Sequence, residues 1–396
     1  MSAIAPQIPK TAPAQADPEK VPPFGSNELR LSAREWVISF GIVLVCMAAV
    51  PRIWKSVEPF APGPDYRIPY VLSKDYWLYQ RRLEQVATPE KVLVLGDSVV
   101  WGEYVRPDGT LSHFLNAGSS SGNRFVNCGV NGLFPLAMEG LVANYGNAIR
   151  NTRVIVHCNV LWMTSPKADL SERRPQKFNH SRLVPQFFPS LPSYGADANE
   201  RLSALIDQHV PYFAWASHLQ NAYYDQKSIA QWTLEEDDND PPNHPNAWRN
   251  PIAPLKSGIP SEPANDPDRG PSSSRHKPWN SGGEGPTTFD WVPLDDSLQW
   301  KAFQQTVEML RSRGNQVLVV FGPFNEHMIA PEQRPTFHLM RQQIVSWLDA
   351  NRFPVVVPET LPSNLYADAS HPLTQGYALL AHELAADSQF RRFVTP

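Results

Sequence analysis

Five short apolar runs, separated by segments with helical spacing, are the feature of this chain that most limits its fold. Each run is continuous and rich in β-branched residues, which is typical of strands buried on both faces of a parallel sheet. Alternating strands and helices predict an α/β fold with three layers, α/β/α, around a five-stranded parallel sheet. The expected strands are Val92–Leu95, Phe125–Cys128, Val154–Cys158, Val317–Phe321 and Pro354–Val357.

Helical segments are expected before, between and after these strands. The segment 297–313 shows the pattern best, because its apolar residues recur at helical spacing and Gly314 follows as a stop signal. The other expected helices cover residues 76–86, 136–149, 334–350 and 374–386.

Two stretches interrupt this alternation within the expected folded part, residues 55–396. Residues 160–232 are mixed in polarity and rich in aromatics, and we interpret them as an insertion or lid over the sheet. Residues 235–290 contain eleven prolines from position 241 onward and few apolar residues. A segment of this composition cannot bury enough apolar surface to fold, so we predict a disordered loop.

The N-terminal region predicts a membrane anchor. Residues 1–34 are polar and rich in Pro and Ala, as in a disordered tail, and Trp36–Pro51 carries no charge. These sixteen residues are fewer than the roughly 20 that span a bilayer, but Arg52 can snorkel and extend the apolar span through Trp54. We therefore expect one transmembrane signal-anchor helix over residues 35–54, with Trp36 and Trp54 at the interfaces.

Two alternatives to the anchor stay open: a signal peptide cleaved after small residues at Ala48-Ala49, and a buried helix of a soluble protein. We favour a single-pass protein of the cell membrane. Its large C-terminal part is expected on the extracytoplasmic side, because a short tail before a lone anchor usually accompanies export.

Charge and cysteine content exclude some classes of partner. The net charge of −4, with acids and bases both well represented, gives no reason to expect nucleic acid. The three cysteines Cys46, Cys128 and Cys158 form no Cys-x-x-Cys pair, which argues against a thiolate zinc site. Cys128 and Cys158 are expected to be small buried hydrophobes; a disulfide between them would require adjacent strands.

A candidate nucleophile follows the first expected strand. Ser98 ends the tripeptide Gly96-Asp97-Ser98, and Asp368 and His371 stand three residues apart near the C-terminus. Ligands of parallel sheets bind beyond the carboxyl ends of the strands, where these side chains can meet. We predict that Ser98 is the nucleophile, His371 its base and Asp368 the orienting carboxylate. Because this triad supplies nucleophile and base, it implies no metal and no organic cofactor.

Further candidate site residues also follow expected strands. An oxyanion needs preorganised donors, and the candidates are the N–H groups of Ser98 and Gly132 and the Asn159 amide, with Asn131 as a fallback. Other residues carry two interpretations each. Trp101 and Trp162 could stack on sugars or pack in the core, and Asn325 could contact substrate or hydrogen-bond within its loop. Asp97 is expected to cap a helix, and His157 to be a core or cleft-wall histidine rather than a base.

These blocks resemble the SGNH, or GDSL, hydrolase superfamily. Gly96-Asp97-Ser98 is similar to its first block, Gly132 stands at the oxyanion glycine of its second, and Asp368-Ala-Ser-His371 is similar to its last. The third block departs from the pattern: the family has Gly-x-Asn-Asp, whereas Asn159 here lies in His-Cys-Asn-Val. The resemblance covers roughly residues 90–160 and 300–390 and implies a flavodoxin-like fold with serine ester hydrolysis.

The sequence is compatible with three functions. The first is a membrane-anchored serine esterase that hydrolyses O-acyl esters, acetyl esters above all, of an extracytoplasmic carbohydrate. The second is an O-acyltransferase that passes the same acyl group to a polysaccharide hydroxyl, as anchored relatives in this superfamily do. The third is a non-catalytic carbohydrate-binding scaffold that kept the fold.

Overall fold

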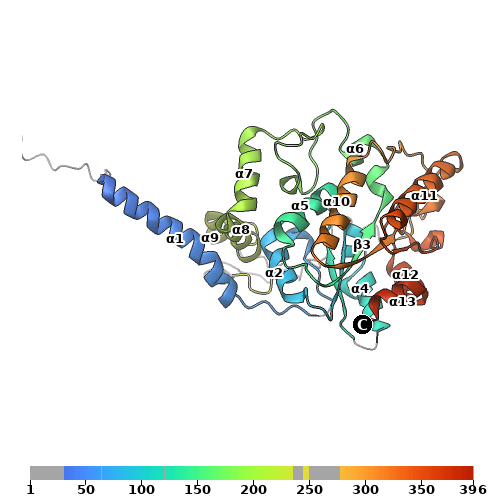
Figure 1. Ribbon diagram of the computed structural model, residues 1–396, viewed down its shortest axis with the longest axis horizontal. Helices are drawn as coiled ribbons and strands as arrows, with labels where there is room; N and C mark the ends of the chain where they lie inside the picture. Colours follow the sequence, from blue (N-terminus) through green and yellow to red (C-terminus); the bar gives the residue numbers. More distant parts are fainter. Residues whose placement is uncertain (1–30, 64, 120–121, 235–243, 249–276, 396) are drawn as a thin grey trace, which may run out of the picture. The chain divides into compact units, whose positions relative to one another are not determined.

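The computed structural model describes residues 31–63, 65–119, 122–234, 244–248 and 277–395 (Figure 1). The chain divides into two units, residues 1–50 and 51–396. Most of the expected N-terminal tail lies outside the described residues. So does most of the expected Pro-rich loop 235–290, of which only 244–248 and 277–290 are described.

The predicted apolar helix near the N-terminus is present. Helix α1 covers Ala33–Val57, a few residues more at each end than expected, and continues through Pro51. Its 25 residues have a mean hydropathy of 2.0 over the most apolar window, so it is long and apolar enough to span a membrane. Only 6% of that window is buried, which does not fit the core helix of a soluble protein. A signal sequence would meet the same criterion of length and hydropathy.

The sheet has five strands, all parallel, in the order β2-β1-β3-β4-β5, which confirms the predicted parallel α/β sheet. Strand β1 lies between β2 and β3: Leu95 pairs with Cys128 on one side and Val156 on the other. The order of connections reverses between β1 and β3, where open parallel sheets bind ligands. The strands are β1 (Val92–Gly96), β2 (Phe125–Gly129), β3 (Arg153–Cys158), β4 (Gln316–Phe321) and β5 (Val355–Val356).

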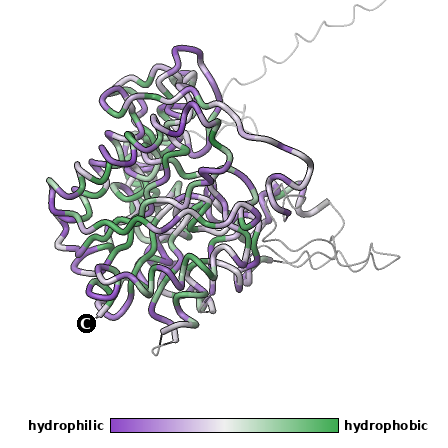
Figure 2. The backbone as a smooth tube through the Cα atoms, turned by 90° about the vertical axis from the view of Figure 1, so that its right-hand side faces the viewer, coloured by the Kyte–Doolittle hydropathy of each residue, from purple (hydrophilic) through white to green (hydrophobic). Residues whose placement is uncertain are grey.

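Helices cover both faces of the sheet. Successive strand residues point to opposite faces, so Leu93 and Leu95 join one apolar core while Val92 and Val94 join another. Hydrophobic segments of the backbone, green in Figure 2, gather in the interior of the folded part. The first core contains side chains of α2 (Tyr76–Val86), α5 (Pro135–Tyr145), α10 (Leu298–Ser312) and α11 (Arg334–Ala350). The second contains side chains of α3 (Ser98–Trp101), α4 (Leu111–Ala117), α12 (Thr374–Ala386) and α13 (Ser388–Val394).

The stretch between β3 and α10 contains several helices, which are joined by turns and irregular segments in the part that the structure describes. It contains α6 (Pro166–Asp169), α7 (Ala198–His209), α8 (Pro211–His218), a π-helical turn (Leu219–Tyr223) and α9 (Ile229–Leu234). Helix α8 packs against α2 and α7. Short 3₁₀ turns complete the described chain at η2 (Tyr70–Leu72), η3 (Pro107–Gly109), η4 (Val160–Met163), η5 (Ser181–Leu183), η9 (Glu326–Met328), η10 (Pro331–Gln333) and η11 (Ser363–Leu365).

The two strand cysteines are buried free thiols. Cys128 lies on β2 and Cys158 on β3, and β1 runs between these strands. The condition for a disulfide, adjacent strands, is therefore not met. Burial raises the pKa of Cys128 to about 12, so its thiol stays protonated and packs as a small apolar group.

A buried ionic cluster joins the helical stretch to residues that precede the sheet. His218, at the end of α8, places Nδ1 2.7 Å from Asp75 Oδ2 and Nε2 2.8 Å from Glu58 Oε1. Its side chain is fully buried. Burial opposes the charged ring, but the two carboxylates outweigh this and raise the pKa of His218 to about 9. The ring is therefore a cation at neutral pH, held between two anions.

This cluster predicts a pH-dependent loss of stability. His218→Leu leaves two buried carboxylates without their partner, which is expected to lower the free energy of unfolding by about 3–5 kcal/mol at neutral pH. Because the folded pKa is raised, the cation's contribution is complete below about pH 6.5 and disappears as the pH rises through about 9. The measurement is urea unfolding of the full chain in detergent micelles at pH 6.5 and 9.5.

The control is His209→Ala, at the exposed end of α7. Equal stability of the two variants at pH 6.5, or a His218→Leu deficit that does not shrink at pH 9.5, would contradict the assigned charge.

Candidate active site

The predicted nucleophile and base meet across the chain. Ser98 is the first residue of α3, directly after β1, and His371 lies in the loop that precedes α12. Although 273 residues separate them, Ser98 Oγ is 2.8 Å from His371 Nε2. Both residues are largely buried, with 8% and 5% of their surfaces exposed. A hydroxyl in this position can transfer its proton to the imidazole as it attacks.

The third member of the triad orients the imidazole. His371 Nδ1 is 2.8 Å from each oxygen of Asp368, so the ring presents Nε2 to Ser98. Asp368 Oδ1 also accepts hydrogen bonds from the N–H groups of Ser370 and His371, at 2.9 and 3.0 Å. Burial opposes ionisation of Asp368, but His371 and these donors outweigh it and lower the pKa of the carboxyl to about 2.

Asn325 supports the loop that carries Asp368 and His371. Its side chain donates from Nδ2 to the Asp368 carbonyl at 3.1 Å, and its N–H donates to the Ala369 carbonyl at 2.8 Å. The residue is completely buried. Of the two interpretations of Asn325, these contacts favour hydrogen bonding within the loop over contact with substrate.

Asp97 joins the ends of β1 and β3 beneath the nucleophile. It caps α3, as predicted, because Oδ1 accepts from the Val99 N–H at 2.9 Å. Oδ2 accepts from Asn159 Nδ2 and from Trp162 Nε1, both at 3.0 Å. Burial disfavours its charge, but His157 and His371 outweigh burial and lower the pKa of Asp97. A buried carboxylate thus holds the Ser98 turn against the third strand.

Several donors stand at the strand ends for a developing oxyanion. Ser98 occupies the first helical position, whose N–H has no acceptor in the helix. Gly132 has φ +70°, a left-handed conformation that glycine adopts without strain, and no described residue accepts its N–H. Asn159 Nδ2 has given one hydrogen to Asp97 and keeps a second. Asn131 Nδ2 is buried with no partner among the described residues, which favours Asn131 as a further donor.

The two tryptophans proposed for sugar stacking are each only 1% exposed. Trp101 donates from Nε1 to the Ile68 carbonyl at 2.6 Å, and the Arg67 guanidinium lies 3.9 Å above its ring. Trp162 donates to Asp97. Burial of both indoles favours core packing over a sugar-binding surface.

His157 is likewise buried and does not contact the nucleophile in the way His371 does. Its Nδ1 lies 3.2 Å from Asp97 Oδ1, and neither ring nitrogen makes a well-aligned hydrogen bond with the described residues. This fits the expected wall or core histidine, and among the two histidines it is His371 that contacts Ser98.

Sequence reasoning missed a second carboxylate beside the base. Glu103 Oε2 lies 3.6 Å from His371 Nε2, the nitrogen that faces Ser98. Gly102, in the left-handed conformation, ends α3 and turns the chain back toward the site, and this glycine is the only local sequence signal. Burial opposes the imidazolium, but Asp368, Glu103 and Asp97 outweigh it and raise the pKa of His371 to about 9.

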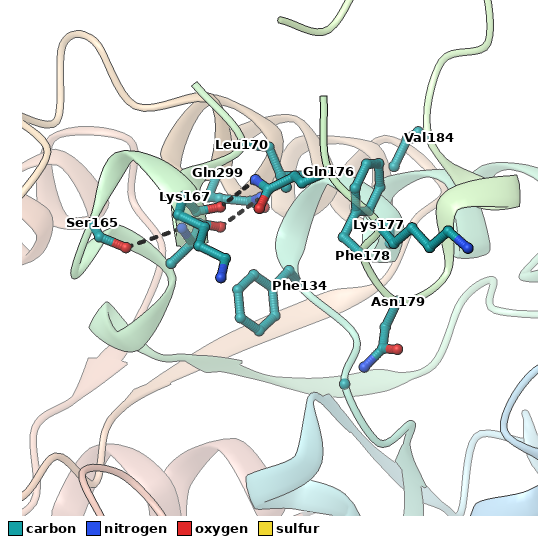
Figure 3. A pocket seen from close by; sticks show the side chains of 13 residues that line it. Phe134, Ser165, Lys167, Leu170, Gln176, Lys177, Phe178, Asn179, Val184 and Gln299 are labelled. Carbon is teal, nitrogen blue, oxygen red and sulfur yellow. Dashed lines mark hydrogen bonds between the residues drawn. The ribbon is translucent and has the colours of Figure 1, made fainter. Parts of the chain in front are cut away.

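Gly132 lines a pocket of about 270 Å³, and Figure 3 shows the side chains around this pocket. Its wall is largely apolar, with Phe134, Leu170 and Phe178, and includes the side chains of Lys167 and Lys177. Most of its lining comes from residues 165–184, within the expected insertion. The other lining residues are Gly132, Phe134, Ala137 and Gln299. The insertion therefore builds part of the surroundings of the candidate oxyanion glycine.

Metal chemistry has no evident ligand set in the part of the chain that the structure describes. No three His, Cys, Asp or Glu residues there form a cluster that could hold a metal ion.

No protein-family model and no curated protein matches this chain. The assignment of a chemistry to the site therefore rests on the geometry of Ser98, His371 and Asp368.

Removal of the Glu103 charge is expected to lower the pKa of His371. In Glu103→Gln one of the anions that stabilise the imidazolium is gone, so the ring releases its proton at lower pH than in the wild type. The measurement is an NMR titration of ¹³C-labelled histidines in the full chain. Glu332→Gln, an exposed glutamate outside the site, is the control. An unchanged His371 titration in Glu103→Gln would show that Glu103 does not act on the base.

Proposed function

We propose that this chain is a membrane-anchored serine esterase of the SGNH type, which hydrolyses O-acyl esters, acetyl esters above all, of an extracytoplasmic carbohydrate. One observation carries the proposal: Ser98 Oγ lies 2.8 Å from His371 Nε2, while the other ring nitrogen binds Asp368. The strand order 2-1-3-4-5 and the position of Ser98 at the switch point between β1 and β3 support a flavodoxin-like SGNH fold.

The first half of the reaction forms an acyl-enzyme. Ser98 Oγ attacks the ester carbonyl carbon, and its proton passes to His371 Nε2. Asp368 stabilises the imidazolium, and the N–H groups of Ser98 and Gly132 with the amide of Asn159 stabilise the oxyanion, each such donor contributing about 3–4 kcal/mol. Collapse of the tetrahedral intermediate breaks the bond to the sugar oxygen, which takes the proton from His371 and leaves as an alcohol.

The second half restores the free enzyme. Water attacks the acyl carbon and gives a proton to His371, and a second tetrahedral intermediate forms on the same donors. The bond to Ser98 Oγ then breaks, Ser98 takes the proton back from His371, and the carboxylic acid leaves. The pocket of about 270 Å³ beside Gly132 offers space for a part of the substrate attached to the reacting carbonyl.

The second candidate is transfer of the acyl group to a polysaccharide hydroxyl in place of water. The burial of Ser98 and His371 supports this acyltransferase, because only 8% and 5% of their surfaces are exposed. Restricted access of water to the acyl-enzyme would favour transfer over hydrolysis. The apolar helix α1, which would hold the site beside an envelope polymer, supports the same possibility.

Loss of the nucleophile tests the proposed esterase. Ser98→Ala in the full chain is expected to lower turnover of 4-nitrophenyl acetate by about 10³-fold or more. Ser112→Ala, a buried serine of α4 outside the triad, should retain wild-type turnover. Equal turnover by the wild type and Ser98→Ala, or none by either, would sink both enzymatic proposals and favour the non-catalytic scaffold.

Product partition separates the esterase from the acyltransferase. With an acetyl-ester donor, an esterase releases acetate at the same rate with or without an oligosaccharide acceptor. A transferase forms acetylated oligosaccharide at the expense of acetate, and its total turnover rises when the acceptor is added. Acetylated product that also disappears in Ser98→Ala would favour transfer over hydrolysis.

A further inference from the structure

The two sides of the Asn131–Gly132 peptide bond have different partners. The Asn131 carbonyl accepts a hydrogen bond from His180 Nε2 at 2.8 Å. The Gly132 N–H, on the opposite side of the same planar group, has no acceptor among the described residues. Because the peptide is planar, a contact that fixes the direction of the carbonyl also fixes the direction of the N–H.

Local sequence alone does not fix this peptide. Gly132 has φ +70° and no Cβ, and glycine populates positive and negative φ with similar ease. An oxyanion donor acts only when it is already aimed at the position where charge develops. A donor on a glycine therefore depends on contacts from elsewhere in the fold.

His180 is suited to hold the carbonyl. A carbonyl only accepts, so Nε2 must carry the hydrogen, and Nδ1 then accepts from the Tyr76 hydroxyl, 3.0 Å away. His180 is 2% exposed. Burial, with a smaller effect of Lys74, outweighs the Asn131 contact and lowers the pKa of His180 to about 4. The ring thus stays neutral over the range in which His371 titrates.

The residue before His180 contacts the same glycine. A Cβ built on Gly132 would lie 2.5 Å from Asn179 Nδ2, so the Asn179 amide covers the Cα of Gly132. Asn179, labelled in Figure 3, lines the same pocket as Gly132. Two consecutive residues between β3 and α10 therefore enclose the Asn131–Gly132 segment.

We infer that His180 is a positioning residue which, oriented by Tyr76, holds the Asn131–Gly132 peptide so that the Gly132 N–H serves as an oxyanion donor. The inference rests on the proposed function. It gives the helical stretch between β3 and α10 a part in the reaction beyond covering the sheet. The hydrogen bond to the carbonyl also polarises the amide, which strengthens its N–H as a donor.

Substitution of His180 tests the inference through the split between kcat and KM. In the full chain, His180→Leu is expected to lower kcat for 4-nitrophenyl acetate by about 10²- to 10³-fold, with KM changed by less than about threefold. His180→Gln should recover at least about tenfold, because its Nε2 can donate to the same carbonyl. Tyr76→Phe, which removes only the orienting hydrogen bond, should cost about two- to tenfold in kcat.

A matched variant shows whether His180 acts by positioning the Asn131–Gly132 peptide or only by holding the insertion in place. Arg201 donates to the carbonyls of Tyr194 and Ala196, at 2.7 and 3.0 Å, and Arg201→Met should loosen this region without touching Asn131. Wild-type kcat in Arg201→Met supports the inference. A kcat loss equal to that of His180→Leu would overturn it, as would a His180→Gln variant no more active than His180→Leu.

Failure of the proposed function is distinguishable from failure of the inference. If the wild type shows no Ser98-dependent turnover, the proposed function fails and the role of His180 falls with it. If turnover depends on Ser98 but His180→Leu keeps the wild-type kcat, only the role of His180 is overturned.

Discussion

The buried carboxylate of Asp97 is the interaction on which the candidate site depends most. It caps the helix that begins with Ser98, and it binds Asn159 and Trp162 beyond the end of β3. Leaving a buried polar group without partners costs about 1–3 kcal/mol, and more for a charged one, so the three donors and the carboxylate must remain together. The turns after β1 and β3 are consequently fixed relative to each other. Ser98, the candidate nucleophile, sits on one of them, at the switch point of the sheet.

The negative charges around His371 favour its protonated form, whereas a base must be neutral to accept a proton. Asp368 must stay ionised to orient His371, yet together with Glu103 and Asp97 it holds the pKa of the imidazole near 9. A base that is protonated at neutral pH cannot accept the serine proton. In the proposed esterase, loss of the Glu103 charge beside Nε2 would therefore favour the neutral form of His371 that can accept the proton.

The sequence predicted the features that depend on local pattern. Continuous β-branched runs gave the five strands, although Val355–Val356 is shorter than expected, and helical spacing gave helices 334–350 and 374–386 to the residue. The triad followed from Ser98 at a strand end and the spacing of Asp368 and His371. In both cases a short stretch of sequence is enough for the prediction. Periodicity is a property of neighbouring residues, and residues that directly follow a strand lie at the end of the sheet where ligands bind.

The features that the sequence did not predict depend on packing between residues far apart in the chain. The contacts of His180 with Asn131, and of Glu103 with His371, join residues without any shared periodicity. Burial of Trp101 and Trp162 depends on partners such as Ile68 and Asp97, so an aromatic after a strand could not be assigned to core or surface from sequence.

Covalent trapping shows whether Ser98 carries an activated hydroxyl. The full chain would be treated with a serine-reactive phosphonate, and the adduct located by intact-mass and peptide mass spectrometry. We expect one phosphonyl group per chain, on Ser98, formed much more slowly in His371→Ala because the hydroxyl has lost its base. Labelling at other serines with Ser98 unmodified, or equal rates in the wild type and His371→Ala, would contradict this expectation.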